Sequence, residues 1–437
     1  MPTPDSKNQL IIFGRYPRVG QVKTRLIPIL GPAGAAALQK RLAERTMAAA
    51  RRLADRTAVW VVFCYDGGSR QRIERWLGLK DIGYQPQAAG GLGRRMRHAM
   101  QTAFRRGARR VVLVGTDIPD LTDAILSQAF DRLKACDLVL GPSTDGGYWL
   151  VGLTRPIDIF DSIPWSTSAV LEKTLALARR AGLQTELLDP LTDLDTPDDL
   201  IGKRRAPLWT GPYLSVIIPT FNNARHIAAT ISASASPDTE IVVSDGGSRD
   251  DTLEIAKAHG ARTVVGTQLR ADRLNRGAAA TRGAVLLFVP ADTRLPNHFE
   301  HTIFETLMDR QQIIGAFQFQ TTPTLRWITC WTHWRTKMFK LPCSDHVLFM
   351  RRGDFTKASG FPELPIAENL YLVRRMAQPG SFTVVPRATT ASAERLRRRG
   401  LLRTMLVDTL LAAGCRAGMS PGRLATVAAL IDQSIRS

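Results

Sequence analysis

The chain has 437 residues, a formal charge of +20, and a composition of 44% apolar and 22% charged side chains. This apolar content can fill folded cores, so the composition excludes a disordered chain. The length predicts two or three domains, because one core rarely extends beyond about 250–300 residues. The excess of positive charge indicates a polyanionic ligand, such as nucleic acid, a phosphorylated small molecule or an acidic membrane surface.

The positive charge is divided evenly along the chain. A cut near residue 206 leaves 31 basic and 21 acidic residues before it, and 28 basic and 18 acidic residues after it. Each part therefore carries +10. Because no single basic arm explains the total, nucleic acid is not expected among the partners.

Cysteine usage and hydropathy predict a soluble cytoplasmic protein. The five cysteines are widely spaced and form no C-x-x-C pair, which fits neither a disulfide framework nor a cysteine zinc site. The first residues lack the apolar stretch of a signal peptide. The most hydrophobic late segment, from Leu401 to Cys415, is interrupted by Arg403 and Asp408 and is too short to span a membrane.

The chain divides into two segments with a similar order of elements. Residues 203–213 combine a charge run with two prolines and a glycine, which is typical of a linker and predicts domains at 1–206 and 207–437. Apolar strands are expected at 10–13, 59–65, 111–117, 137–142, 214–219, 240–245 and 285–292. Helical stretches such as 34–55 and 121–134 lie between them. Strands rich in Val and Ile that alternate with helices predict mostly parallel sheets covered on both faces.

Each segment contains an apolar strand that is followed by an aspartate, Asp117 in the first and Asp292 in the second. In open α/β sheets, ligands bind beyond the carboxyl ends of the strands. A carboxylate at that edge can hold Mg²⁺ or Mn²⁺, which keeps several waters and bridges substrate phosphates. The alternative for Asp117 is a helix N-cap, a role that Asp120 or Thr122 could fill instead.

A glycine-containing basic stretch, GRYPRVGQVKTRL, follows the first strand. Its turn frees backbone N–H groups to approach phosphate, and its cations include Arg15, Lys23 and Arg25. This pattern favours phosphate binding, with a solvated basic loop as the alternative.

Two later motifs of the first segment add polar and flexible positions. GPSTDGGYWLVGL contains Gly146 and Gly147, which allow a ligand to approach the backbone closely. In DLDTPDDL, Asp195 is either a second metal ligand or part of an ordinary helix start with Thr196 as the cap.

The first segment resembles a known family. FGRYPRVGQVKTRL, GGLGRRM, VGTDIPDL, GPSTDGGYWLVGL, PWST and DLDTPDDL occur in the order seen in GT-A-like transferases associated with radical-SAM and selenodomain genes and with arsenosugar biosynthesis. Members of this transferase family are also similar to nucleotidyltransferases such as the phospholactate guanylyltransferases. The resemblance covers residues 9–200 and implies a Rossmann-like nucleotide fold, with Arg15, Lys23 and Arg25 near phosphates and Asp117 near a metal.

The second segment resembles family-2 glycosyltransferases in SVIIPTFNN, VSDGGSRDDT and PADTRLP. The resemblance implies that Asp245 accepts a hydrogen bond from the base of a nucleotide and that Pro219 and Thr220 lie beneath that base. LRADRLNRGAAATRG is similar to a companion family linked to the same genes, which implies a diphosphate contact for Arg270 and a polar site position for Asn275.

Three positions depart from the family-2 pattern. Asp292 aligns with the last carboxylate of the DxD metal motif, but the first position is Pro290, which cannot ligate. The acidic pair that supplies the catalytic base reads Glu-Asn, so Glu368 is the remaining candidate base. The Gly-Asp-Gln motif of the catalytic set keeps only Asp345.

An aromatic stripe lies outside these motifs. Trp327, Trp331 and Trp334 are spaced i, i+4 and i+7, which places them on one face of a helix. We expect a core or domain-interface position for this stripe, with acceptor stacking or membrane contact as the less favoured alternatives. The basic run ERLRRRGLLRTMLVDTLL favours a solvated C-terminal face over an interfacial helix at an anionic membrane.

Together these features predict an α/β protein with two tandem GT-A-like (Rossmann-like, mostly parallel sheet) nucleotide-diphospho-sugar transferase domains and a C-terminal helical extension. The expected function is a bifunctional glycosyltransferase that uses nucleotide-activated sugars, a small-molecule acceptor and Mg²⁺ or Mn²⁺. In the alternative, the first half is a nucleotidyltransferase that releases pyrophosphate from an NTP and a phosphorylated acceptor. The second half is then a weakly active or non-catalytic nucleotide-sugar-binding domain.

Overall fold

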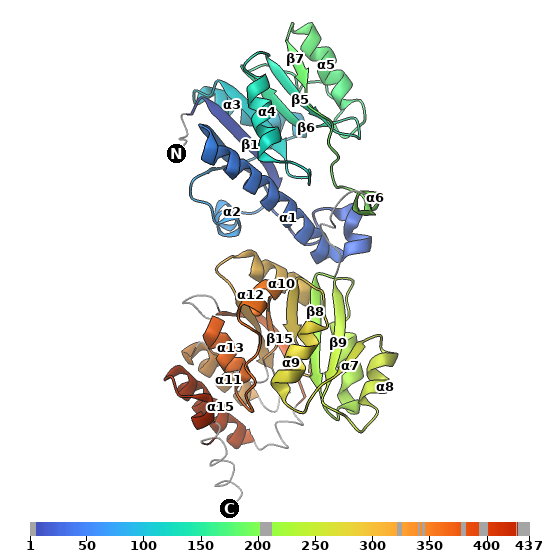
Figure 1. The fold of residues 1–437 in the computed structure, drawn as a ribbon, viewed down its shortest axis with the longest axis vertical. Helices are drawn as coiled ribbons and strands as arrows, with labels where there is room; N and C mark the ends of the chain where they lie inside the picture. Colours follow the sequence, from blue (N-terminus) through green and yellow to red (C-terminus); the bar gives the residue numbers. More distant parts are fainter. Residues whose placement is uncertain are drawn as a thin grey trace, which may run out of the picture. The chain divides into compact units, whose positions relative to one another are not determined.

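The computed structural model describes residues 6–201, 212–320, 326–339, 341–342, 346–376, 382–392, 401–424 and 426 (Figure 1). The chain forms two compact units, Met1–Trp209 and Thr210–Ser437. Most of the predicted linker, and the expected boundary at residue 206, lies outside the described residues. Across the described ranges, none of the helices combines the length and the hydropathy that a membrane span requires.

The first unit is built on a seven-stranded sheet. Its strands are β1 (Asn8–Arg15), β2 (Val59–Asp66), β3 (Gly83–Pro86), β4 (Arg110–Gly115), β5 (Leu138–Pro142), β6 (Tyr148–Leu153) and β7 (Thr185–Leu187). They lie in the order β3-β2-β1-β4-β6-β5-β7, and β6 runs antiparallel to both of its neighbours while the other pairs are parallel. The predicted apolar strands of this segment are therefore confirmed.

The helices of the first unit cover this sheet. They are α1 (Ile27–Arg56), α2 (Arg70–Leu77), α3 (Leu92–Arg105), α4 (Asp123–Arg132), α5 (Val170–Arg180) and the short α6 (Pro197–Ile201), with a 3-10 turn at Thr24–Leu26. Helix α3 packs Met96 and Met100 against Ile11 and Leu113 of the sheet. Helix α1 packs against β1 and β2 and bends at Gly31, whose φ of 71° is not helical.

The second unit has an eight-stranded sheet. Its strands are β8 (Leu214–Thr220), β9 (Thr239–Asp245), β10 (Arg262–Val265), β11 (Val285–Phe288), β12 (Thr293–Arg294), β13 (Ile314–Gln320), β14 (Leu348–Arg351) and β15 (Phe382–Ala391). The order is β10-β9-β8-β11-β14-β13-β15-β12. Strand β14 is antiparallel to β11 and β13, and β12 is antiparallel to β15. The apolar strands expected at 214–219 and 240–245 are present, whereas the one expected at 285–292 ends at Phe288 and leaves Asp292 four residues beyond it.

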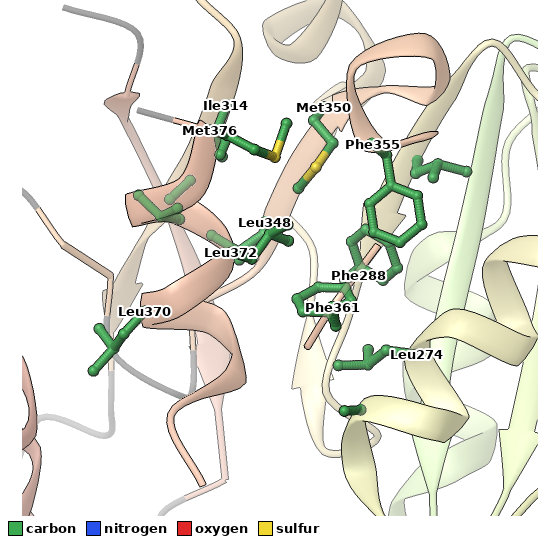
Figure 2. Packing of buried hydrophobic residues seen from close by; sticks show 14 of the residues in the cluster. Leu274, Phe288, Ile314, Leu348, Met350, Phe355, Phe361, Leu370, Leu372 and Met376 are labelled. Atoms are coloured by element: carbon green, nitrogen blue, oxygen red, sulfur yellow. The ribbon is translucent and has the colours of Figure 1, made fainter. Parts of the chain in front are cut away.

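The helices of the second unit pack on its sheet, and two of them, α9 and α13, share one apolar cluster. The helices are α7 (Ala224–Ser234), α8 (Thr252–Ala258), α9 (Arg270–Ala279), α10 (Phe299–Met308), α11 (Arg326–Phe339), α12 (Arg352–Lys357), α13 (Glu368–Met376) and α15 (Leu401–Arg416). Figure 2 shows Leu274 of α9, Phe288 of β11 and Leu372 of α13 in one apolar cluster with Phe361 of the segment between α12 and α13. The Phe288 and Phe361 rings meet edge to face at 4.9 Å. This packing places the first residues of α9 and α13 close together.

The two units share one strand order. If the second sheet is numbered from β8 and the two-residue β12 is left out, both sheets read 3-2-1-4-6-5-7 with strand 6 reversed. The register agrees as well, because Arg15 is paired with Asp66 where β1 and β2 end, and Thr220 with Asp245 where β8 and β9 end. This confirms the predicted α/β class with mostly parallel sheets, and it makes Asp66 the positional equivalent of Asp245.

Candidate functional site

Three predicted site residues of the first unit meet at the carboxyl edge of its sheet. Lys23 Nζ lies 2.8 Å from Asp117 Oδ1 and 2.6 Å from Asp195 Oδ1, and it also donates to the Leu194 carbonyl at 2.7 Å. The Lys23 side chain is only 4% exposed, whereas both carboxylates are 43% exposed. The ammonium is therefore enclosed, and the carboxylates remain open to a ligand.

Local structure explains the position of Asp117. It follows β4 by two residues, and its carbonyl accepts a hydrogen bond from Leu194 N at 3.0 Å. The next helix, α4, is capped by Thr122, whose hydroxyl accepts from Ile125 N at 3.3 Å. The N-cap role considered for Asp117 thus belongs to Thr122, and the Asp117 carboxylate contacts Lys23 instead.

The backbone at Asp195 is fixed by the start of α6. Asp199 Oδ2 accepts hydrogen bonds from the N–H groups of Asp195 and Thr196, at 3.0 and 2.7 Å, and from the Thr196 hydroxyl at 2.8 Å. The helix start predicted in DLDTPDDL is present at Pro197. The helix start therefore exists, with Asp199 rather than Thr196 as the acceptor, and the Asp195 carboxylate contacts Lys23. Its role as a metal ligand stays a prediction.

Charge in this site favours a cation. Burial alone would lower the pKa of Lys23, but the charges of Asp117 and Asp195 outweigh it and raise that pKa, so the amine stays protonated. Burial and then the charges of Asp145 and Asp195 raise the pKa of Asp193. The charges of Asp145 and Asp195 thus add to burial in disfavouring the ionised form of Asp193, and a cation near these three carboxylates would counter both effects.

The donor set fits a metal ion only in part. Asp117 and Asp195 offer the oxygen ligands that Mg²⁺ and Mn²⁺ prefer, and they converge on a single point of positive charge. No group of three or more His, Cys, Asp or Glu side chains suited to a metal occurs within the ranges that the structure describes. The residues therefore suit an ion that completes its shell with water and substrate oxygens.

The paired glycines lie beside these carboxylates. Gly146 has a φ of 91°, and a Cβ there would lie 2.2 Å from the Ser168 carbonyl oxygen, so only glycine fits this turn. Gly147 N donates to Asp145 Oδ1 at 2.9 Å. Ser143, at the start of the turn, donates its hydroxyl to Asp193 Oδ1 at 3.2 Å. The turn and the carboxylate segment thus form one site.

The raised pKa of Asp193 predicts a pH dependence of stability. Between the ordinary carboxyl pKa of 3.8 and the raised value, the folded state binds more protons than the unfolded state, so the free energy of unfolding falls as pH rises through that window. We expect Asp193→Asn to raise the midpoint of thermal unfolding by about 1–3 °C at neutral pH, with solvent screening included. The gain should vanish in acid, and Asp131→Asn, on an exposed surface pair, should show no such trend.

A second polar cluster lies at the carboxyl end of β2, and the sequence did not predict it. Arg95 Nη1 donates to Asp66 Oδ2 at 3.0 Å and to Gln87 Oε1 at 3.4 Å. The predicted Arg15 is 68% exposed, with its Nε 3.7 Å from Asp66 Oδ2, and the predicted Arg25 is also exposed. Two signals could have found this cluster, because Asp66 ends the second strand as Asp245 does, and Arg95 lies in the motif GGLGRRM.

In the second unit, Arg270 and Glu368 form an ion pair. The two side chains come from the first residues of α9 and α13, and Arg270 Nη1 also donates to Asn369 Oδ1 at 3.5 Å. The Glu368 side chain is 7% exposed. The predicted diphosphate contact and the predicted base are therefore neighbours that neutralise each other.

Asp245 is buried and its carboxylate binds the loop that follows it. Oδ2 accepts from Gly247 N at 2.8 Å and Ser248 N at 2.7 Å, and Oδ1 accepts from the Ser248 hydroxyl at 2.5 Å. The Thr220 carbonyl accepts from Gly246 N at 2.9 Å and from Arg273 Nη1 at 2.7 Å. Burial and the nearby Arg270 lower the pKa of Arg273, a site residue that the sequence did not single out.

The remaining predicted residues of this unit occupy varied positions. Pro219 is buried in β8, and Asn275 exchanges two hydrogen bonds of 2.8 Å with the Phe361 backbone, which fixes the turn before α13. Asp292 is half-buried beyond β11, and its carbonyl accepts from Ser392 N at 3.1 Å. Asp345 lies outside the described residues.

Comparison with known families assigns each unit. Residues 47–167 match the family described as "Uncharacterized protein conserved in bacteria (DUF2064)", and residues 215–354 match "Glycosyl transferase family 2". The first unit is thus similar to one family and the second unit to the other, and the family-2 match supports a transferase. Together with the shared strand order, these matches establish two tandem GT-A-like α/β domains.

Individual relatives cover parts of the chain. A PGL/p-HBAD biosynthesis glycosyltransferase from Mycobacterium bovis (strain BCG / Pasteur 1173P2) is 37% identical over 94 residues, which are 19% of this chain and 37% of that protein. The chain thus spans little more than a third of the length of the curated relatives it matches.

Two solved structures are similar to parts of the chain. A proposed nucleotide-diphospho-sugar transferase from Desulfovibrio desulfuricans G20 is 37% identical, over 44% of this chain and 83% of that one, with a TM-score of 0.40. The mannosyltransferase PcManGT from Pyrobaculum calidifontis, solved with GDP-Man and Mn²⁺, is 17% identical over 51% of this chain and 74% of that one, with a TM-score of 0.36.

Proposed function

We propose that the chain is a bifunctional glycosyltransferase-type enzyme in which each unit binds a nucleotide-activated substrate and is assisted by Mg²⁺ or Mn²⁺. The observation that carries the proposal is the convergence of Lys23, Asp117 and Asp195 at the carboxyl edge of a sheet whose strand order recurs in the family-2 domain. That edge is where open α/β sheets bind ligands.

The first unit has the groups that a diphosphate needs. Lys23 would neutralise charge that develops on the leaving phosphate, and the exposed Arg15 and Arg25 would add positive charge at the same edge. Asp117 and Asp195 would hold a metal ion, which would supply positive charge against the substrate phosphates. The motifs of this unit also support a link to arsenosugar biosynthesis genes.

Asp66 is our proposed base-recognition residue in the first unit. It occupies the position of Asp245 in the shared register, and its side chain is 39% exposed beside Arg95. A carboxylate there would accept from a ring or amino N–H of the base, and an amide would replace one acceptor oxygen with a donor. Arg95 and Gln87 would hold the carboxylate in place.

Exchange of Asp66 for asparagine tests this role. We expect Asp66→Asn to raise the KM for the nucleotide by about tenfold or more, with a smaller change in kcat, and to alter the preference among bases. Asp123→Asn, which alters a carboxylate paired with Arg52 and Arg56, is the matched control. Unchanged KM and base preference in Asp66→Asn would refute the assignment.

The competing function for the first unit is nucleotidyl transfer. An NTP and a phosphorylated acceptor would then yield pyrophosphate, whereas an NDP-sugar and an acceptor yield NDP. The same side chains would serve both reactions, because negative charge develops on phosphate oxygens in each of them. The cations would stabilise that charge directly, and the carboxylates would do so by holding a metal ion. Product analysis with the whole chain separates the two.

In the second unit, Glu368 would act as the general base and Arg270 would contact the diphosphate, with Asp245, Thr220 and Asp292 around the nucleotide and metal. The ion pair in the structure supports a sequence of events. A diphosphate at Arg270 competes with Glu368 for the guanidinium, so donor binding would free the carboxylate to accept the proton of the acceptor hydroxyl. Asp345 keeps its proposed place in the catalytic set.

A further inference from the structure

A cavity lies at the amino edge of the first sheet, opposite the edge that holds the Lys23 site. It is found where β4, β5 and β7 begin and where β6 and α4 end, and its volume is about 340 Å³. Its lining includes Arg109, Arg110, Thr154 and Gln184. Cavities that hold small molecules usually measure about 300–1,000 Å³, so this one suits a ligand of the smallest class.

The backbone around the cavity is already hydrogen-bonded. The N–H groups of Asp137 and Leu138 donate to the Gln184 carbonyl at 2.9 and 3.1 Å, and Gln184 N donates to Asp137 Oδ2 at 3.1 Å. Thr154 N donates to the Asp137 carbonyl at 3.2 Å. These bonds hold the walls in place, so a ligand would be recognised by side chains rather than by these N–H groups.

Two arginines give the cavity a positive charge. A third cation of the lining, Lys134, is neutralised by an ion pair with Asp131 at 2.7 Å. Among the residues that the structure describes, no acidic side chain forms an ion pair with Arg109 or Arg110. The charge of both guanidinium groups is therefore left for a ligand.

The guanidinium of Arg110 is held in place by neutral acceptors. Its Nε donates to the Leu133 carbonyl at the end of α4, at 3.1 Å, and its Nη1 donates to Asn8 Oδ1 at 3.5 Å. Arg110 is half-buried, whereas Arg109 is exposed and can move to meet a ligand. Phosphate is the anion that guanidinium groups bind best in proteins, because each group can donate two hydrogen bonds to its oxygens.

The other polar groups of the lining suit hydroxyl groups. The Asp137 side chain is 30% exposed and accepts hydrogen bonds, while the Thr154 hydroxyl and the Gln184 amide both donate and accept. None of the described residues that line the cavity is aromatic, so no ring is present on which a nucleotide base could stack. This set favours a phosphorylated sugar over a nucleotide.

The distance along β4 separates this cavity from the site at the carboxyl edge. The strand begins at Arg110, and Asp117 lies beyond its other end. An extended chain between these two residues spans roughly 20 Å. A sugar phosphate is too small to reach both ends of the strand, so a ligand in the cavity leaves the Lys23 site open.

We infer that this cavity is a second ligand site of the first unit and binds a sugar phosphate. Arg110 and Arg109 hold the phosphate, and Asp137, Thr154 and Gln184 hold the hydroxyl groups of the sugar. The site is independent of the proposed transfer reaction, so its test needs no transferase activity.

Isothermal titration calorimetry with the full chain tests the inference, with glucose 6-phosphate, glucose and inorganic phosphate as probes. We expect glucose 6-phosphate to bind at least about tenfold more tightly than either of the others, because it alone supplies both phosphate and hydroxyl groups. Arg109→Gln should weaken that binding by about tenfold or more. Gln184→Ala should weaken the binding of glucose 6-phosphate but not of inorganic phosphate. Arg106→Gln, at an exposed arginine outside the lining, is the matched control and should bind as the wild type does.

Lys23→Met separates the cavity from the site at the carboxyl edge, and it should bind glucose 6-phosphate as tightly as the wild type does. Equal thermal midpoints without ligand would show that all variants are folded. The inference would be overturned by no binding of glucose 6-phosphate, by equal affinity for inorganic phosphate, or by unchanged binding in Arg109→Gln or Gln184→Ala. Loss of binding in Lys23→Met alone would assign the sugar phosphate to the carboxyl edge and also overturn it.

Discussion

Lys23→Met should lower kcat/KM of the first unit by about 100-fold or more, the loss typical when a preorganised charge at a developing anion is removed. The enclosed ammonium lies within 2.8 Å of both site carboxylates, and methionine fills similar volume without charge. The measurement is steady-state product release with saturating metal.

The same variant separates a phosphate role from a purely structural one. Because the ammonium occupies the point where Asp117 and Asp195 converge, its removal should tighten Mn²⁺ binding while it weakens nucleotide binding. Lys134→Met, at an exposed i,i+3 pair with Asp131, should change neither. If Lys23→Met bound nucleotide as tightly as the wild type, the phosphate role would be wrong.

Glu368→Gln should lower sugar transfer by the second unit by about 100- to 10,000-fold, the range of a lost general base. The donor should bind as well as before or better, because glutamine no longer holds Arg270 by charge and the guanidinium is free for the diphosphate. A low kcat with an unchanged or lower KM for the donor is the expected pattern.

Glu363→Gln provides the control, because Glu363 is an exposed carboxylate in the segment that leads to α13. Full activity of Glu368→Gln would exclude Glu368 as the base. Loss of donor binding in Glu368→Gln, with kcat intact, would instead give the Arg270–Glu368 pair a structural role.

Sequence patterns singled out residues that the fold of the first unit brings together, because these residues lie beside strand ends and glycine turns. A strand that ends near Asp117 and a turn at Gly146 are local features, and the topology of an α/β sheet then brings them to one edge. The contact of Lys23 with both aspartates was not predictable in the same way, since Asp195 lies 172 residues away. Only the folded structure shows that the carboxylates of Asp117 and Asp195 contact the Lys23 ammonium.

The second unit shows contacts that residue types alone did not predict. Arg270 and Glu368 were assigned to separate ligands, and their mutual ion pair depends on α9 and α13 packing on one core. Asp245 was assigned to a base, yet the structure gives both of its oxygens partners in the loop that follows, because Gly247 and Ser248 turn their N–H groups back to it. Local hydrogen bonds of this kind compete with ligands for a carboxylate.

The core position expected for the tryptophan stripe is wrong for Trp331 and Trp334, which are 36% and 48% exposed, whereas the side chain of Trp327 lies outside the described residues. The physical reason is a different one. Helical spacing predicts that residues share a face, but it does not say which face is buried. Apolar residues usually face the core, and here the buried side of α11 carries Arg335 and Thr336. A polar inner face with an aromatic outer face reverses the usual pattern, which is why burial had to come from the structure.

The central claim is that the two units carry two separate transferase sites, and the released phosphates test it directly. The whole chain, Lys23→Met and Glu368→Gln are each incubated with Mn²⁺, a panel of NTPs and NDP-sugars, and candidate acceptors, and the products are resolved by phosphorus NMR. We predict two release activities in the wild type, with each variant losing a different one. Loss of both activities in one variant, or the same single activity in both variants, would contradict two separate sites.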